Sequence, residues 1–258
     1  FINKELNNKT KNLKILEIGG AHGVLEVEYS KNFNTSEWII IEPNPSPVPE
    51  CNAKFIKKFF DKDVSLKNEF DCLVHSHTLE HMYDPMEFLS CLNNFMKSEQ
   101  RMIFSVPDLK HWLNNKFPNT LNFEHTFYLT ENLCDEILAN TGFKLISKKY
   151  FGNRHSIFYN VKKDKKVSKL YSNNYFTNKN SFLDFIEFYK NDVRDINQKL
   201  ENYDNEIYLF GAHIFSQYLL AFGLNQNKIK KIVDNDTAKQ GMRLYGTNLF
   251  VDSPKILC

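Results

Sequence analysis

The sequence predicts an α/β protein, in which a doubly wound, mostly parallel sheet is followed by a smaller C-terminal α/β unit. Short apolar segments alternate with segments of helical spacing, as in sheets that helices cover on both faces. A glycine turn follows the first expected strand, and a strand, a glycine turn and a helix recur near the C-terminus. The 258 residues are enough for one large domain and a small one.

The elements of the large unit follow one another in a regular order. Strands are expected at 13–20, 38–43, 53–60, 70–77 and 101–107. Helices are expected directly after Gly23 and at 85–97. A further helix, with Thr130 as its N-cap, should end at Gly142 and lead into a strand that reaches residue 151.

The C-terminal part begins with a long amphipathic pattern. Apolar residues recur at spacings of three and four, which predicts a helix with one packed face: Phe182, Phe185, Ile186, Tyr189, Val193, Ile196 and Leu200. A strand, glycine turn and helix are expected over 206–224, and a strand over 228–236 contains Asp234. This acid indicates either a second nucleotide site or a unit used for packing or assembly, and we favour the second. The predicted organisation is a domain at 1–160, a connector with an amphipathic helix at 161–202, and a small α/β unit at 203–258.

Composition narrows the function classes. The 33 basic and 31 acidic residues give a net charge of +2, which offers no electrostatic case for binding nucleic acid or an anionic membrane surface. The five cysteines are scattered without a C-x-x-C pair, as is typical of reduced thiols in the cytoplasm. We expect neither a secretory signal nor a membrane span.

The stretch KILEIGGAHG, residues 14–23, predicts a ligand site. Its three glycines, at 19, 20 and 23, allow unusual backbone angles and a close approach of backbone to ligand at the carboxyl edge of a parallel sheet. The spacing, with Ala21 between them, does not match the dinucleotide pattern G-x-G-x-x-G. Glu17, inside the strand end, would repel a phosphate and suits a cationic group, such as the ammonium or sulfonium of an aminoacyl-type nucleoside.

A second acid supports a nucleoside. Glu42 ends the next expected strand, 23 residues after Gly19, where a carboxylate can accept hydrogen bonds from both ribose hydroxyls. The proline-rich loop EPNPSPVPE, residues 42–50, follows at once. It is either a rigid connector or a wall beside the bound ligand.

Together these motifs resemble those of the class I S-adenosylmethionine-dependent methyltransferases. LEIGGAHG is similar to their first motif, IIIEPN to the second, and FFDKD (59–63) to the segment that contacts adenine. The part of the chain from FDCLVHSHTLEH to RMIFSVP resembles the fourth strand of the family, the helix after it and the fifth strand. FEHTFYLTENL resembles the segment that follows the fifth strand. The resemblance covers about residues 13–160 and implies a Rossmann-like fold and S-adenosylmethionine as cofactor. It implies these cofactor-binding residues: Glu17, Gly19, Gly20, Ala21, His22, Gly23, Glu42, Pro43, Phe60, Asp61, Ser76 and His77.

The C-terminal unit resembles that of the sugar C-methyltransferases of deoxysugar biosynthesis. The similar segments are YLFGAHIFSQYLLAFGL, IVDNDTAKQGMRLYGTNLF and NRHSIFYNV. This implies a carbohydrate-type small molecule as acceptor, nucleotide-linked sugars included, and is compatible with a homodimer. Alternatives are an O-methyltransferase for a surface-polysaccharide or other small-molecule precursor, a catalytically inactive cofactor-binding subunit, and an NAD-linked oxidoreductase.

Histidine is the usual base for removing the proton of an acceptor at neutral pH. The resemblance assigns this role to a Glu-His pair at the position of Glu124 and His125, which could instead only hold a loop in place. His75, His77 and His81 could form a metal site by their spacing. The resemblance places this segment beside the cofactor and the acceptor, so no metal is expected.

Overall fold

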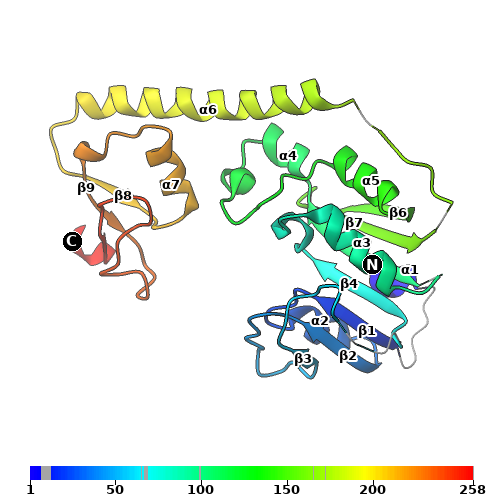
Figure 1. Ribbon diagram of the computed structural model, residues 1–258. Coiled ribbons are helices and arrows are strands. Elements are labelled where there is room, and N and C mark those ends of the chain that lie inside the picture. Colours follow the sequence, from blue (N-terminus) through cyan, green and yellow to red (C-terminus); the bar gives the residue numbers. More distant parts are fainter. Residues whose placement is uncertain are drawn as a thin grey trace. The chain divides into compact units, whose positions relative to one another are not determined.

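The computed structural model describes residues 1–6, 13–64, 66, 69–98, 100–164, 166–171 and 173–257. The chain divides into two compact units (Figure 1). The first contains residues 1–111 and 123–174, and the second contains 112–122 and 175–258.

The first unit is built on a seven-stranded sheet in the order β3-β2-β1-β4-β5-β7-β6. The strands are β1 (Leu13–Ile18), β2 (Thr35–Ile41), β3 (Lys54–Ile56), β4 (Cys72–Ser76), β5 (Arg101–Pro107), β6 (Phe143–Phe151) and β7 (Ser156–Lys163). The first five are mutually parallel, and β7 is antiparallel to both of its neighbours. The predicted doubly wound, mostly parallel sheet is therefore confirmed.

The helices of this unit lie before β1 or between successive strands in sequence. They are α1 (Ile2–Glu5), α2 (Val24–Ser30), the short 3₁₀ helix η1 (Leu79–His81), α3 (Pro85–Phe95) and α5 (Glu131–Asn140), while α4 (Leu109–Asn114) crosses the boundary between the units. Asp84 caps α3 by accepting the N–H of Glu87, and Pro85 occupies the first turn. Gly142, with φ of +80°, follows α5 as predicted.

Two hydrophobic clusters cover the opposite faces of the sheet. Alternate residues of one strand point to opposite faces, so Leu16 belongs to one cluster and Ile15 to the other. Burial on both faces explains why these strands are continuous apolar segments in the sequence. The strand expected at 53–60 is shorter than predicted, because only Lys54–Ile56 pairs with β2 before the chain turns toward the cleft described below.

The second unit has a three-stranded parallel sheet in the order β10-β9-β8. Its elements are the 3₁₀ helix η2 (Pro118–Leu121), α6 (Tyr175–Glu201), β8 (Ile207–Phe210), α7 (Ile214–Ala221), η3 (Gln226–Lys228), β9 (Ile229–Val233), β10 (Val251–Asp252) and η4 (Pro254–Leu257). The predicted stripe lies on α6, and three of its members, Phe185, Tyr189 and Val193, are buried.

The compact units differ from the sequence-based boundaries in three places. The helix α6 belongs to the second unit instead of to a separate connector. Residues 112–122 belong to the second unit, where the hydroxyl of Tyr189 donates a hydrogen bond to the carbonyl of Lys116 at 2.6 Å. Residues 161–174 belong to the first, because β7 continues to Lys163. No helix in the described part of the chain is both long and apolar enough to cross a bilayer.

Candidate functional site

A cleft of about 230 Å³ lies at the carboxyl ends of β1, β2 and β4. This is the edge at which open parallel α/β sheets bind ligands. Its lining residues are Ile18, Gly19, Ile41, Glu42, Pro43, Phe59, Phe60, His77, Thr78, His81, Met82 and Phe88. Five of the twelve predicted cofactor residues are among them: Gly19, Glu42, Pro43, Phe60 and His77.

A larger cavity of about 480 Å³ is lined by residues of α1, α2, β4 and β5, with Phe151 and Phe158. Its walls are mainly apolar, and Ser76 is the one predicted cofactor residue in its lining. We take the smaller cleft as the candidate site, because it brings polar groups from three strand ends together.

The glycine turn closes tightly at the edge of the cleft. Gly19 and Gly23 have φ of +75° and +69°, which residues other than glycine rarely adopt. The Gly19 N–H donates to the carbonyl of Ile41 at 3.0 Å and joins the ends of β1 and β2. A Cβ at Gly19 would lie 2.6 Å from Oγ1 of Thr78. Both the backbone angle and the crowding by Thr78 therefore explain why this turn requires glycine at position 19.

The proline-rich loop is attached to the glycine turn. Ser46 and Val48 donate their N–H groups to the carbonyls of Ala21 and His22 at 2.8 and 3.0 Å. The ring nitrogen Nδ1 of His22 is 2.8 Å from the carbonyl oxygen of Ser46. Of this loop, Glu42 and Pro43 line the cleft, so most of the loop supports the turn rather than forming a wall of the cleft.

Glu17 lies beneath the glycine turn and outside the lining of the cleft. It is 3% exposed, and its Oε2 accepts a hydrogen bond from Nε1 of Trp38 at 2.8 Å. A Cβ at Gly20 would lie 2.6 Å from its carboxyl carbon. Burial raises the pKa of Glu17 to about 7, against a smaller opposite effect of the Trp38 hydrogen bond.

Glu42 follows β2 and faces the cleft. Its Oε1 accepts the N–H of Asn44 at 2.9 Å, which fixes the carboxylate where the strand ends. Phe60 lines the cleft as well, with its ring edge-on to Phe88 and Phe95. Asp61 is not in the lining; it caps a local turn by accepting the N–H of Asp63.

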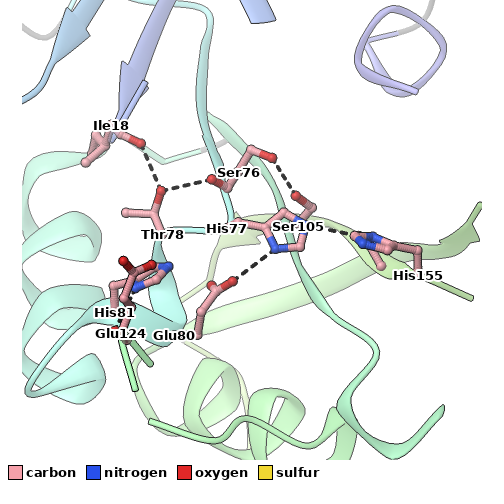
Figure 2. A network of polar contacts seen from close by, with 10 residues as sticks. Ile18, Ser76, His77, Thr78, Glu80, His81, Ser105, Glu124 and His155 are labelled. Carbon is pink, nitrogen blue, oxygen red and sulfur yellow. Dashed lines mark hydrogen bonds and ion pairs between the residues drawn. The ribbon is translucent and has the colours of Figure 1, made fainter. Parts of the chain in front are cut away.

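His77 lies at the centre of a polar network (Figure 2). Its backbone has φ of +50°, which turns the chain sharply after β4. Its Nδ1 is 3.0 Å from Oε1 of the buried Glu80, and its Nε2 is 3.0 Å from Oγ of Ser156 on β7. Ser156 also contacts Nδ1 of His155 at 2.8 Å. The ring of His77 is thus held from both sides at the wall of the cleft.

His75 does not join this network. It is 1% exposed, and its ring stacks on Phe104 at 4.6 Å and meets Phe88 edge-on. Burial lowers its pKa to about 3, so it is neutral at physiological pH. The predicted metal alternative of His75, His77 and His81 is therefore not assembled.

His125 and Glu124 lie in the loop before α5, next to His81. The rings of His81 and His125 are 5.0 Å apart and perpendicular, and the backbone carbonyl of Glu124 lies 2.9 Å from Nδ1 of His81. Burial lowers the pKa of His125. His81 lines the cleft, and His125 is adjacent to it without being in the lining.

Two residues of the cleft lining, Thr78 and Phe59, were not singled out from the sequence, because a threonine or a phenylalanine by itself does not indicate a binding site.

Asp234 in the second unit has a structural use. Its Oδ2 accepts the N–H of Ala212 at 2.7 Å in the glycine turn after β8, and its Oδ1 accepts the N–H of Asp236. These hydrogen bonds from backbone, Asp236 first, lower its pKa. The acid therefore closes the turn of its own unit.

A family model matches the part of the chain that carries this cleft. Residues 1–148, more than half of the chain, match the model described as "Methyltransferase domain". The chain belongs to this methyltransferase family. It is accordingly an enzyme domain whose cofactor is S-adenosylmethionine.

Solved methyltransferase structures are similar to the methyltransferase domain at low identity. An S-adenosylmethionine-dependent methyltransferase from Clostridium acetobutylicum is 12% identical, with a TM-score of 0.47 over 63% of this chain and 89% of that one. The 1,6-didemethyltoxoflavin-N1-methyltransferase of Burkholderia thailandensis is 13% identical, with a TM-score of 0.48 over 63% and 75%. The magnesium protoporphyrin IX methyltransferase of Synechocystis is 15% identical, with a TM-score of 0.46 over 62% and 78%. No curated protein matches the chain.

Proposed function

We propose that this methyltransferase domain transfers the methyl group of S-adenosylmethionine to a carbohydrate-type small molecule, nucleotide-linked sugars included. The observation that supports a transfer site here is that the glycine turn at Gly19, the carboxylate of Glu42 and the imidazole of His77 border one cleft. In the reaction, the C–S bond of the sulfonium breaks and its electron pair stays on sulfur. The acceptor atom forms the new bond to the methyl carbon and loses its proton.

We assign to Glu42 the role of accepting hydrogen bonds from the two ribose hydroxyls of the cofactor. Replacing Glu42 by alanine should weaken binding of S-adenosylhomocysteine by about 1.5–3 kcal/mol, or roughly 10- to 150-fold, because charge-assisted hydrogen bonds to two hydroxyls are lost. Isothermal titration calorimetry measures this directly. Glu50→Ala, an exposed acid of the same loop, is the matched control and should bind normally. Equal affinity of the Glu42 variant and wild type would refute the assignment.

Activation of the acceptor is assigned to the histidines beside the cleft. We retain His125, with Glu124 next to it in sequence, as the candidate base, because burial lowers its pKa and so favours the neutral imidazole, which can accept a proton. His125→Ala should lose turnover while its affinity for S-adenosylhomocysteine stays that of wild type. Unchanged turnover in this variant would remove His125 from the mechanism.

Location and assembly are proposed from weaker features. Four cysteines, at 51, 72, 91 and 134, are free thiols, in keeping with a reducing compartment such as the cytoplasm. The second α/β unit, whose Asp234 serves its own turn, is proposed to pack or to mediate a homodimer. Sedimentation equilibrium that gives the mass of one chain at all concentrations would contradict the dimer.

A further inference from the structure

Three side chains from two separate segments meet beside the cleft. Glu80 and His81 come from η1, directly after β4, and His125 comes from the loop before α5. One ligand atom of each, a carboxylate oxygen and two ring nitrogens, lies within 4.8 Å of the others. Side-chain rotations that move each of these atoms by about 1 Å would bring all three within bonding distance of one ion, since metal–ligand bonds of this kind are roughly 2.0–2.2 Å long.

Glu80 has one oxygen that is satisfied and one that is not. Its Oε1 lies 3.0 Å from Nδ1 of His77, which holds the carboxylate in place (Figure 2). Its Oε2 is buried and has no hydrogen-bond partner among the described residues, although the residue is only 1% exposed. A buried carboxylate oxygen without a partner costs free energy, and native proteins avoid it unless an ion or a water is bound there.

His81 is oriented in the way that metal-binding histidines are. Its Nδ1 lies 2.9 Å from the backbone carbonyl of Glu124, which can only accept a hydrogen bond (Figure 2). Nδ1 must therefore be the protonated nitrogen, and Nε2 retains its lone pair. A hydrogen bond from the second ring nitrogen to a carbonyl is the usual outer partner of a histidine ligand.

Backbone hydrogen bonds fix the distance between the two segments. The N–H groups of Thr126 and Phe127 donate to the carbonyl of Glu80 at 3.0 and 3.1 Å. The hydroxyl of Thr126 donates to the carbonyl of Met82 at 2.8 Å. His125 is thus held against η1 whether or not a ligand is present, so the cluster is formed in advance.

We propose that Glu80, His81 and His125 bind one divalent cation of the zinc class. Two imidazoles and one carboxylate suit Zn²⁺, Co²⁺ or Fe²⁺, whereas Mg²⁺ prefers oxygen ligands. Three protein ligands leave a position open for a water or a substrate oxygen. His81 lines the cleft that contains Gly19 and Glu42, so the proposed cation would lie at the border of this cleft.

The inference also specifies the acceptor, and this part rests on the proposed function. A bound cation would take a hydroxyl or carboxylate oxygen of the acceptor and lower the pKa of a coordinated hydroxyl, whose proton passes to solvent. In the metal-bound enzyme His125 is a ligand, and the role of base proposed above belongs to the enzyme without metal. Binding of the metal itself is independent of any acceptor.

The test uses the full chain with its purification tag removed, after treatment with a chelator. Co²⁺ is titrated and followed by its visible absorption, and Zn²⁺ by calorimetry, each with and without S-adenosylhomocysteine. We expect one equivalent of Co²⁺ and of Zn²⁺ to bind, with Mg²⁺ at least about 100-fold weaker. The variants Glu80→Gln, His81→Ala and His125→Ala should each weaken Zn²⁺ binding at least about 10- to 100-fold. His213→Ala, a histidine of the second unit, is the control and should bind as wild type.

The outcomes separate the two proposals. Failure of wild type to bind Co²⁺ or Zn²⁺, or equal binding by wild type and all three cluster variants, would overturn the metal site. Normal binding of S-adenosylhomocysteine in that case would leave the proposed methyl transfer intact. Metal binding without any binding of S-adenosylhomocysteine would refute the proposed function and keep the site. If a variant of Glu80, His81 or His125 no longer binds metal but still binds S-adenosylhomocysteine, the loss of metal binding is not caused by unfolding.

Discussion

Replacing Gly19 by alanine is expected to abolish tight binding of S-adenosylhomocysteine and to lower the free energy of unfolding by roughly 2–5 kcal/mol. Two costs add. Gly19 has φ of +75°, where an L side chain is strained, and the new Cβ would lie 2.6 and 2.9 Å from Oγ1 and Cγ2 of Thr78. Thr78 cannot easily move, because it is buried, branched at Cβ and hydrogen-bonded to the carbonyl of Ile18.

Gly152→Ala is the control that separates strain from crowding. Gly152 lies in the same unit with φ of +57°, and a Cβ there would meet only Cβ of His155 at an ordinary 3.6 Å. It should lose only the strain cost, roughly 1–2 kcal/mol, and should bind the cofactor normally. Thermal denaturation and calorimetry on both variants check this. A Gly19 variant as stable and as tight-binding as the Gly152 variant would contradict the crowding at the turn.

The same turn shows how much of the site the sequence could predict. Gly19, Glu42 and His77 are local signals, because each directly follows or ends a strand that its apolar residues mark. Parallel strands bring such positions to one edge, so the cleft at that edge could be predicted before any contact was known. The place of β7 beside β5 could not, since this antiparallel pairing joins segments that lie far apart in the chain.

The contacts that complete the site depend on tertiary pairing. Ser156 reaches His77 only because β7 pairs with β5, and His125 meets His81 only because the loop before α5 is tied to η1. For the same reason the alternative grouping of His75 with His77, which the family resemblance did not favour, does not form: a two-residue period places side chains on one face, but the positive φ of His77 turns the chain away from the strand. Period alone cannot reveal where a strand stops.

The buried carboxyl of Glu17 should make the free energy of unfolding depend on pH. Its pKa is raised from 4.5 to about 7, with burial as the first cause. The folded protein therefore keeps the proton over a range in which the unfolded chain has lost it. This contribution to stability is fully present below pH 4.5 and decreases as pH rises to about 7, by roughly 3 kcal/mol at most.

Glu17→Gln should remove this dependence, because the amide keeps the shape and an oxygen that can accept from Nε1 of Trp38. We expect the variant to match wild type near pH 4.5 and to exceed its stability at pH 8. Denaturant unfolding from pH 4.5 to 8, followed by Trp38 fluorescence in a Trp112→Phe background, measures the difference, with exposed Glu50→Gln as control. A pH-independent difference between variant and wild type would show that Glu17 titrates normally.

The same variant decides between two uses of Glu17. The sequence predicts that its charge faces the cationic end of the cofactor, whereas its carboxylate lies under Gly20 and bonds to Trp38. If the charge attracts the cofactor, Glu17→Gln weakens S-adenosylhomocysteine at pH 8 and has little effect at pH 5, where the wild-type acid is already neutral. If Glu17 only supports the turn, affinity is equal at both pH values. We expect the second result, because the buried hydrogen bond to Trp38 holds the carboxylate away from the cleft lining.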